Sequence, residues 1–134
     1  MTQLNAAVIL AASLALAAPA TAQDLVEGGE LYMDFCAVCH GVGATGDGPL
    51  AEALIVRPPD LTQLAQGGEF PLLQVIGQID GRNPLLAHGG DMPLFGPWFE
   101  GDGADVAMQG PGGQPVLMSR PIADLVAYLM AVQS

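Results

Sequence analysis

The chain has 134 residues, which is the length of one small domain, and 51% of them are hydrophobic. It carries 14 acidic residues against three arginines and no lysine, for a net charge of −11. This balance argues against binding to nucleic acid or to an anionic membrane surface, because both need positive charge, and it favours partners with basic faces.

Residues 1–22 read as an export signal. Residues 6–18 form an apolar Ala/Leu run that is short for a bilayer span, and Ala20-Thr21-Ala22 has the A-x-A pattern of a cleavage site. No Lys or Arg precedes the apolar run, which departs from the usual signal and leaves an uncleaved membrane tether as the alternative. We expect cleavage near Ala22/Gln23, a periplasmic location, and a mature domain at residues 23–134.

The first predicted helix of the mature domain contains the cysteines. Asp24 can cap this helix, and apolar residues then recur at three- and four-residue spacings through Val38. Four glycines within residues 41–48 predict a loop. Residues 49–54 can form a short helical turn. The N-terminal third of the domain is therefore expected to be one helix followed by irregular chain.

Two further helices are predicted in the middle of the chain. Asp60 opens a short one, which Gly67-Gly68 ends. Pro71 precedes a segment with a clearer helical pattern, LLQVIGQI, and Gly81 ends it. From residue 83 to 118 the chain is rich in Gly and Pro and has no clear period. No strand pattern is recognised in it.

Ser119 is expected to cap the last helix, which presents an apolar stripe. The stripe consists of Ile122, Leu125, Val126 and Leu129. The domain as a whole is thus predicted to have about four short helices and much loop. So small a core is hard to stabilise unaided, and a bulky apolar cofactor at its centre would complete it.

Both cysteines lie in one cluster, Cys36-Ala37-Val38-Cys39-His40. Two thiols three residues apart at the end of a helix project to one side, where they can add to the two vinyl groups of one haem. The imidazole that follows then reaches the iron. Free thiols do not persist in an oxidising compartment, and thioether bonds would consume both of them. The cluster therefore favours one covalent haem c, with His40 as an iron ligand.

Three other interpretations of the cluster compete with haem. A thioredoxin-like redox pair needs a strand before the motif and a helix after it, whereas the predicted order is helix and then loop. A disulfide leaves the histidine unexplained. A zinc site could combine the cluster with His88, but adjacent Cys39 and His40 suit tetrahedral ligation poorly and a second paired half is missing.

The cluster and its surroundings resemble the class I cytochromes c, the monohaem c-type cytochromes. Gly28 and Tyr32 lie eight and four residues before Cys36, as in that family's N-terminal helix, and residues 125–129 (LVAYL) are similar to its C-terminal helix. The resemblance covers nearly all of residues 23–134. It implies an all-α, loop-rich fold of about four short helices wrapped around a covalently bound haem, in which the two terminal helices cross.

The resemblance also suggests the second iron ligand. Residues 88–96 (HGGDMPLFG) are similar to the family's methionine loop, which implies that Met92 binds the iron opposite His40. A thioether prefers ferrous iron and so raises the reduction potential. Three other residues are candidates for this position: His88, Met108 and Met118.

The other candidate ligands, and the residue that supports the ligating imidazole, can also be placed from the sequence. His88 is the alternative ligand, or else a surface or supporting residue. Met118 is expected in the core and Met108 at the surface. In the family a loop proline's carbonyl holds the ligating imidazole, and residues 58–61 (PPDL) are similar to that segment. The resemblance therefore assigns this role to Pro59, with the neighbouring proline as the alternative.

Arginines are the natural donors to the haem propionates. Arg57 and Arg82 are the preferred candidates, and Arg120 at a helix start is the least favoured. One segment departs from the compact members of the family: residues 96–114, with Trp98 and three nearby acids, read as an inserted flap. Such a flap could cover the haem edge, meet a partner, or be a tolerated surface insertion.

Together these features predict a periplasmic monohaem carrier of single electrons, and not an enzyme. With both axial positions filled by protein, the iron has no open site for a substrate. One alternative is a haem-based sensor or ligand-binding module in which a gas displaces Met92. Another is a dedicated electron-transfer subunit of an oxidoreductase complex. The expected partners are redox proteins with basic docking faces, with no nucleic acid and no stable membrane insertion after cleavage.

Overall fold

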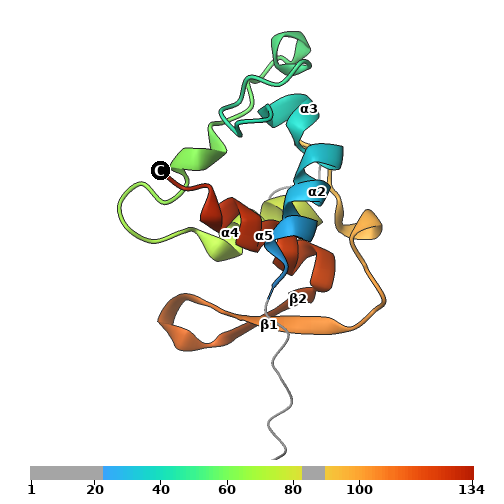
Figure 1. The fold of residues 1–134 in the computed structure, drawn as a ribbon, viewed down its shortest axis with the longest axis vertical. Coiled ribbons are helices and arrows are strands. Elements are labelled where there is room, and N and C mark those ends of the chain that lie inside the picture. Colours follow the sequence, from blue (N-terminus) through green and yellow to red (C-terminus); the bar gives the residue numbers. More distant parts are fainter. Residues whose placement is uncertain (1–22, 83–89) are drawn as a thin grey trace, which may run out of the picture.

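The computed structural model describes residues 23–82 and 90–134, which form helices, short 3₁₀ turns and one two-stranded sheet (Figure 1). In chain order the elements are α2 (Leu25–Phe35), α3 (Ala37–His40), η1 (Ala51–Ala53), η2 (Leu61–Gln63), α4 (Leu72–Asp80), η4 (Gly96–Trp98), β1 (Asp105–Gln109), η5 (Pro111–Gly113), β2 (Pro115–Ser119) and α5 (Arg120–Ala131). The described chain is mostly helical and loop-rich, as predicted. Residues 1–22, which hold the predicted signal, and His88 lie outside the described residues.

Helices α2 and α5 pack against each other at the centre of the molecule (Figure 1). A glycine makes the close approach possible, because a Cβ added at Gly28 would overlap the backbone carbonyl of Asp124. One turn further on, Tyr32 is fully buried, and its ring lies 5.3 Å from that of Tyr128 between centroids. The expected contact between the terminal helices is therefore confirmed.

Polar groups fix the beginning of α2. The side chain of Asp24 accepts hydrogen bonds from the backbone N–H groups of Val26 and Glu27, as its capping role predicted. The backbone N–H of Asp24 in turn donates to Asp124 Oδ1 at 2.8 Å. Asp124 is buried in α5. It ties the start of α2 to α5.

Of the two predicted middle helices, the second is confirmed as α4, whereas the first is a single 3₁₀ turn, η2, that ends at Gln63, before the predicted end at Gly67-Gly68. The side chain of Asp60 accepts from Thr62 N–H at the start of η2, and Gly81, with φ of 83°, ends α4 in the left-handed conformation. Helix α4 turns an apolar face to the core, formed by Leu72, Val75, Ile76 and Ile79. The last helix begins after Ser119 as predicted, but the Ser119 side chain makes no capping hydrogen bond.

The expectation of a strandless chain was wrong. Strands β1 and β2 form an antiparallel hairpin within and beside the predicted flap, with Val106 opposite Met118 and Met108 opposite Val116. These four residues alternate with exposed neighbours and turn toward the core. Met118 is buried as expected, whereas Met108 is half-buried against the core rather than on the surface. The hairpin therefore covers one end of the helical core.

Within residues 23–82 and 90–134, no helix is both long enough and apolar enough to cross a membrane.

Candidate cofactor site

The cysteine cluster lies at the junction of α2 and α3. Cys36 ends the first helix, where its N–H donates to the Tyr32 carbonyl at 2.9 Å, and it also begins the second. Its own carbonyl accepts from the N–H groups of Cys39 and His40. This tight turn presents two free thiols, of which that of Cys36 is buried and that of Cys39 is half-buried.

His40 is buried, and its ring nitrogen Nδ1 lies 3.2 Å from the carbonyl oxygen of Pro59. Burial lowers the pKa of His40, although the hydrogen bond to Pro59 opposes this shift. The neutral imidazole is thus favoured. Because a carbonyl can only accept, Nδ1 carries the proton and Nε2 keeps a free electron pair that can bind a metal. The structure therefore brings together the two residues to which the resemblance gave these roles.

The glycine loop holds the Pro59 segment against α3. Gly46 N–H donates to the His40 carbonyl at 2.8 Å, and Leu61 N–H donates to the Ala44 carbonyl at 2.7 Å. Gly46 has a φ of 79°, and a Cβ at this position would overlap the carbonyl oxygen of Pro58. Glycine is therefore required where the loop passes the proline segment that contacts His40.

Further polar contacts fix the backbone around the motif. The hydroxyl of Tyr32 donates to the carbonyl of Gly41 at 2.6 Å, directly after His40. Burial is the main cause that raises the pKa of Tyr32, so this hydroxyl stays protonated and available as a donor. Sequence reasoning placed Tyr32 in the helix crossing and missed this second contact, which joins α2 to the residue directly after His40.

Burial also affects the first thiol of the motif. Burial, and to a lesser extent the neighbouring Cys39, raises the pKa of the Cys36 thiol to about 11. Among the residues that the structure describes, no group of three or more His, Cys, Asp and Glu side chains is arranged to hold a metal ion.

Met92 is half-buried and packs against the same apolar cluster that contains Cys36. The cluster offers the dry surroundings that a flat apolar cofactor needs. A buried imidazole with one free nitrogen, two thiols on one turn and a thioether beside the same core make a donor set that fits haem c. Whether Met92 faces the iron stays a prediction.

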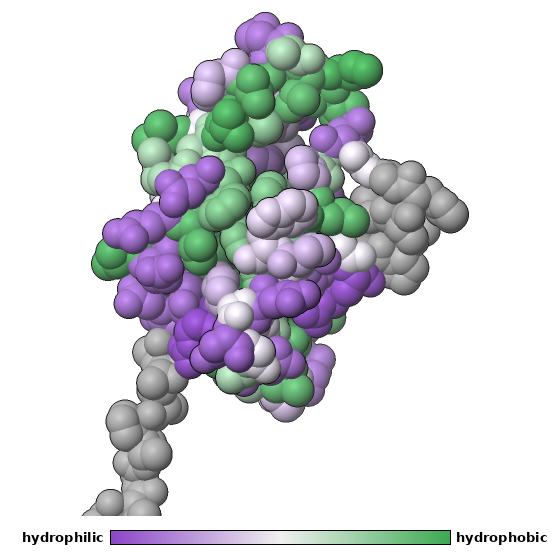
Figure 2. Space-filling model, turned by 90° about the vertical axis from the view of Figure 1, so that its right-hand side faces the viewer, coloured by the Kyte–Doolittle hydropathy of each residue, from purple (hydrophilic) through white to green (hydrophobic). Residues whose placement is uncertain are grey.

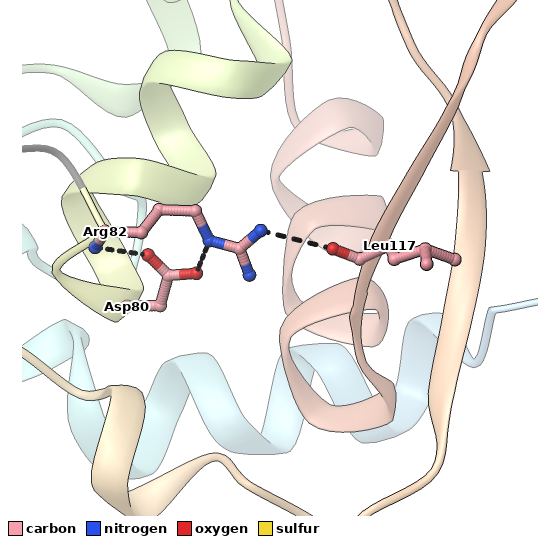
Figure 3. A network of polar contacts seen from close by, with 3 residues as sticks. All are labelled: Asp80, Arg82 and Leu117. Carbon is pink, nitrogen blue, oxygen red and sulfur yellow. Dashed lines mark hydrogen bonds and ion pairs between the residues drawn. The ribbon is translucent and has the colours of Figure 1, made fainter.

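The arginines are placed differently from one another. Arg82 forms an ion pair with Asp80 and also donates from Nη1 to the carbonyl of Leu117 on β2 at 3.2 Å (Figure 3). Its guanidinium thus joins the end of α4 to the hairpin, a role that the sequence did not suggest. Arg57 is exposed in the loop before Pro59, and Arg120 begins α5. A role of Arg57 or Arg82 at the propionates stays a prediction.

Comparison with known protein families gives a match over most of the chain. A family model described as Cytochrome c matches residues 25–133, which is most of the chain. Neither the comparison with curated proteins nor that with solved structures gave a match.

Proposed function

The chain belongs to the cytochrome c family, and from this membership we propose that it is a periplasmic one-electron carrier whose haem iron is ligated by His40 and Met92. As a member of the family it binds haem c covalently and is an electron-transfer cytochrome. The bound haem supplies an iron that alternates between the ferrous and ferric states.

The observation that carries the proposal is the contact between His40 and Pro59. The 3.2 Å bond from Nδ1 fixes the ring orientation and assigns the proton, so that Nε2 is the nitrogen left for iron. Burial of His40 and of Cys36 beside it keeps water away from this face. A ligand held this rigidly needs little rearrangement when the iron changes charge, which suits a carrier.

The half-buried position of Met92 favours the electron carrier over the gas sensor. A half-buried thioether that packs against the core is held by its neighbours and is not easily displaced. A soft sulfur also favours ferrous iron and so supports a higher reduction potential. With Met92 and His40 both bound, the iron has no coordination site for a substrate.

The direct test is a visible spectrum of the purified protein, oxidised and reduced, with and without carbon monoxide. We expect a low-spin spectrum in both states and no change on addition of carbon monoxide. Colour that survives acid and organic extraction would report the thioether bonds to Cys36 and Cys39. Ready binding of carbon monoxide to the wild-type protein would favour the sensor instead.

Export is tested separately by sequencing the N-terminus of the purified protein. A mature chain that begins at Gln23 in the periplasmic fraction is expected. A chain that begins at Met1 and fractionates with membranes would instead support the uncleaved tether.

A further inference from the structure

Trp98 is the chain's single tryptophan, and it is 69% exposed at the surface of η4. Tryptophan is large and mostly apolar, so leaving it in water sacrifices much of the free energy that its burial would release. It is also among the residues most enriched at the centres of protein interfaces. An exposed tryptophan is therefore suited to anchor a protein partner.

A rigid base supports the exposed ring. Phe99 is 2% exposed and stacks on Phe95 with 5.7 Å between ring centroids. Phe95 N–H donates to the carbonyl of Ile79 at the end of α4, and Trp98 N–H donates to the carbonyl of Phe95. A surface held in place in this way loses little conformational entropy when it binds.

The same aromatic residues reach the haem attachment. Phe35, which directly precedes Cys36, contacts Phe99 edge-on at 5.1 Å between centroids, and it also contacts Phe95 at 6.1 Å. Phe95 contacts Trp98 at 6.4 Å. A series of ring contacts thus joins Phe35, the residue before Cys36, to Trp98 at the surface.

Three acids follow Trp98 on one exposed segment: Glu100, Asp102 and Asp105. The segment leaves η4 and descends to β1 along one side of the molecule (Figure 1), and a turn bends it where Gly103 N–H donates to the carbonyl of Glu100. Figure 2 looks onto this side, where hydrophilic residues gather in the lower part. The exposed indole is therefore bordered in sequence by negative charge.

We propose that Trp98, together with Glu100, Asp102 and Asp105, is the docking surface for a redox protein that presents arginines. A guanidinium stacks on an indole face and pairs with carboxylates, so arginine suits this combination better than lysine does. The inference rests on the proposed carrier function: one electron leaves the iron for the partner's redox centre, or returns from it. A second copy of the chain is a poor occupant, because the charge of −11 makes the copies repel each other.

The test uses the reduced holoprotein labelled with ¹⁵N, in which the indole N–H of Trp98 gives a single NMR signal. The probe is a tri-arginine peptide blocked at both ends. We expect this signal to shift on titration, the association to weaken as salt is raised, and a blocked tri-lysine peptide to bind less tightly. An indole signal that does not move would overturn the proposal.

Two charge variants separate the docking surface from overall charge. Replacing Glu100→Gln, Asp102→Asn and Asp105→Asn together should lower the association constant roughly tenfold at low salt. This is the combined effect expected from the loss of three exposed ion pairs. The matched control makes the same change in charge on the exposed face of α2, with Glu27→Gln, Glu30→Gln and Asp34→Asn. We expect its effect to be less than twofold. If the association constant fell equally in the two variants, net charge alone would explain the binding, and the proposal would be overturned.

A kinetic measurement tests whether the surface serves electron transfer. The oxidant tris(phenanthroline)cobalt(III) is cationic and aromatic, whereas hexacyanoferrate(III) is anionic. Trp98→Ala should slow oxidation by the first several-fold and leave oxidation by the second unchanged. Equal effects on the two oxidants, or a dimer that Trp98→Ala dissociates in sedimentation, would overturn the docking surface. The two proposals can fail separately. The iron ligands are tested by the carbon monoxide spectrum, whereas the docking surface is tested by the NMR shift of the Trp98 indole and by the oxidation rates of Trp98→Ala.

Discussion

Met92 is the residue on which the choice between carrier and sensor depends. Replacing Met92 by Ala should open the sixth coordination site, so that the reduced protein binds carbon monoxide. The potential should fall by a sizeable part of the ~0.8 V range that axial ligands span, because water stabilises ferrous iron less than a thioether does. Redox titration and the carbon monoxide spectrum measure both effects.

The two methionines of the hairpin, Met108 and Met118, provide the controls. Met108→Ala should leave the low-spin spectrum intact, and so should Met118→Ala, although truncating the buried Met118 should cost about 2–5 kcal/mol of stability. If Met108→Ala opened the iron while Met92→Ala resembled the wild type, the ligand assignment would be wrong.

Gly46 should control the contact between His40 and Pro59. Gly46→Ala places a Cβ against the Pro58 carbonyl and imposes a φ of 79° on a residue with a side chain, so the proline segment must shift. We expect a loss of about 1–3 kcal/mol in the free energy of unfolding and a change in potential, because the imidazole loses its fixed partner. Chemical denaturation and redox titration are the measurements.

Gly43 lies in the same loop and offers a matched control. A Cβ there would meet nothing closer than 3.9 Å, and its φ is not in the left-handed region. Gly43→Ala should therefore leave the potential unchanged. A Gly46→Ala protein with wild-type potential would show that the proline carbonyl does not tune the iron.

Single residues differ in how well the sequence predicts their surroundings. The contact between His40 and Pro59 could be anticipated, because a known motif specifies which residue binds and which supports it. The burial of Asp124 could not, because an acid on a predicted helix is usually exposed. Its partner is the backbone N–H of Asp24, a hundred residues away in the chain, and side-chain type alone gives no signal of such a pairing.

At the scale of elements, the α2–α5 contact depends on one of two adjacent glycines. Gly28→Ala would drive a methyl group into the Asp124 carbonyl and force the helices apart, at a cost of several kcal/mol. Gly29→Ala meets only the ring of Tyr128 at 3.4 Å, so the higher helix propensity of Ala should nearly offset any strain. Thermal unfolding of the two variants should separate them clearly. Equal stability would mean that the helices can shift without cost.

The hairpin shows why some elements escape prediction from sequence. Strands β1 and β2 do alternate, but their outward positions include Ala107 and Leu117, which are apolar and obscure the period of two. Pro115 also begins β2, and proline is rare inside strands. Helices α4 and α5 were easier to predict than the hairpin, because glycine and proline mark their ends and a long apolar stripe marks the face that packs on the core.

At the scale of the whole molecule, the fold and the cofactor depend on each other. The described core is a small set of side chains, most of them from helices α2, α4 and α5, and long loops surround it. The sequence predicted this dependence, because a short chain with four brief helices cannot bury enough surface by itself. It could not predict which loops close over the core, because glycine- and proline-rich segments carry no periodic signal.

Removing the two thioether bonds should therefore unfold the protein, and not only remove its haem absorbance. In a double Cys36→Ala, Cys39→Ala variant the haem is no longer held covalently, and we expect the stabilisation lost to be comparable with the whole ~5–15 kcal/mol free energy of unfolding of a small domain. We expect little periplasmic protein and a far-UV circular dichroism spectrum without helix. Cys39→Ala alone leaves one thioether at the buried Cys36 and should retain colour and part of the helix signal. Recovery of the double variant as a stable, colourless fold would show that this core assembles without haem.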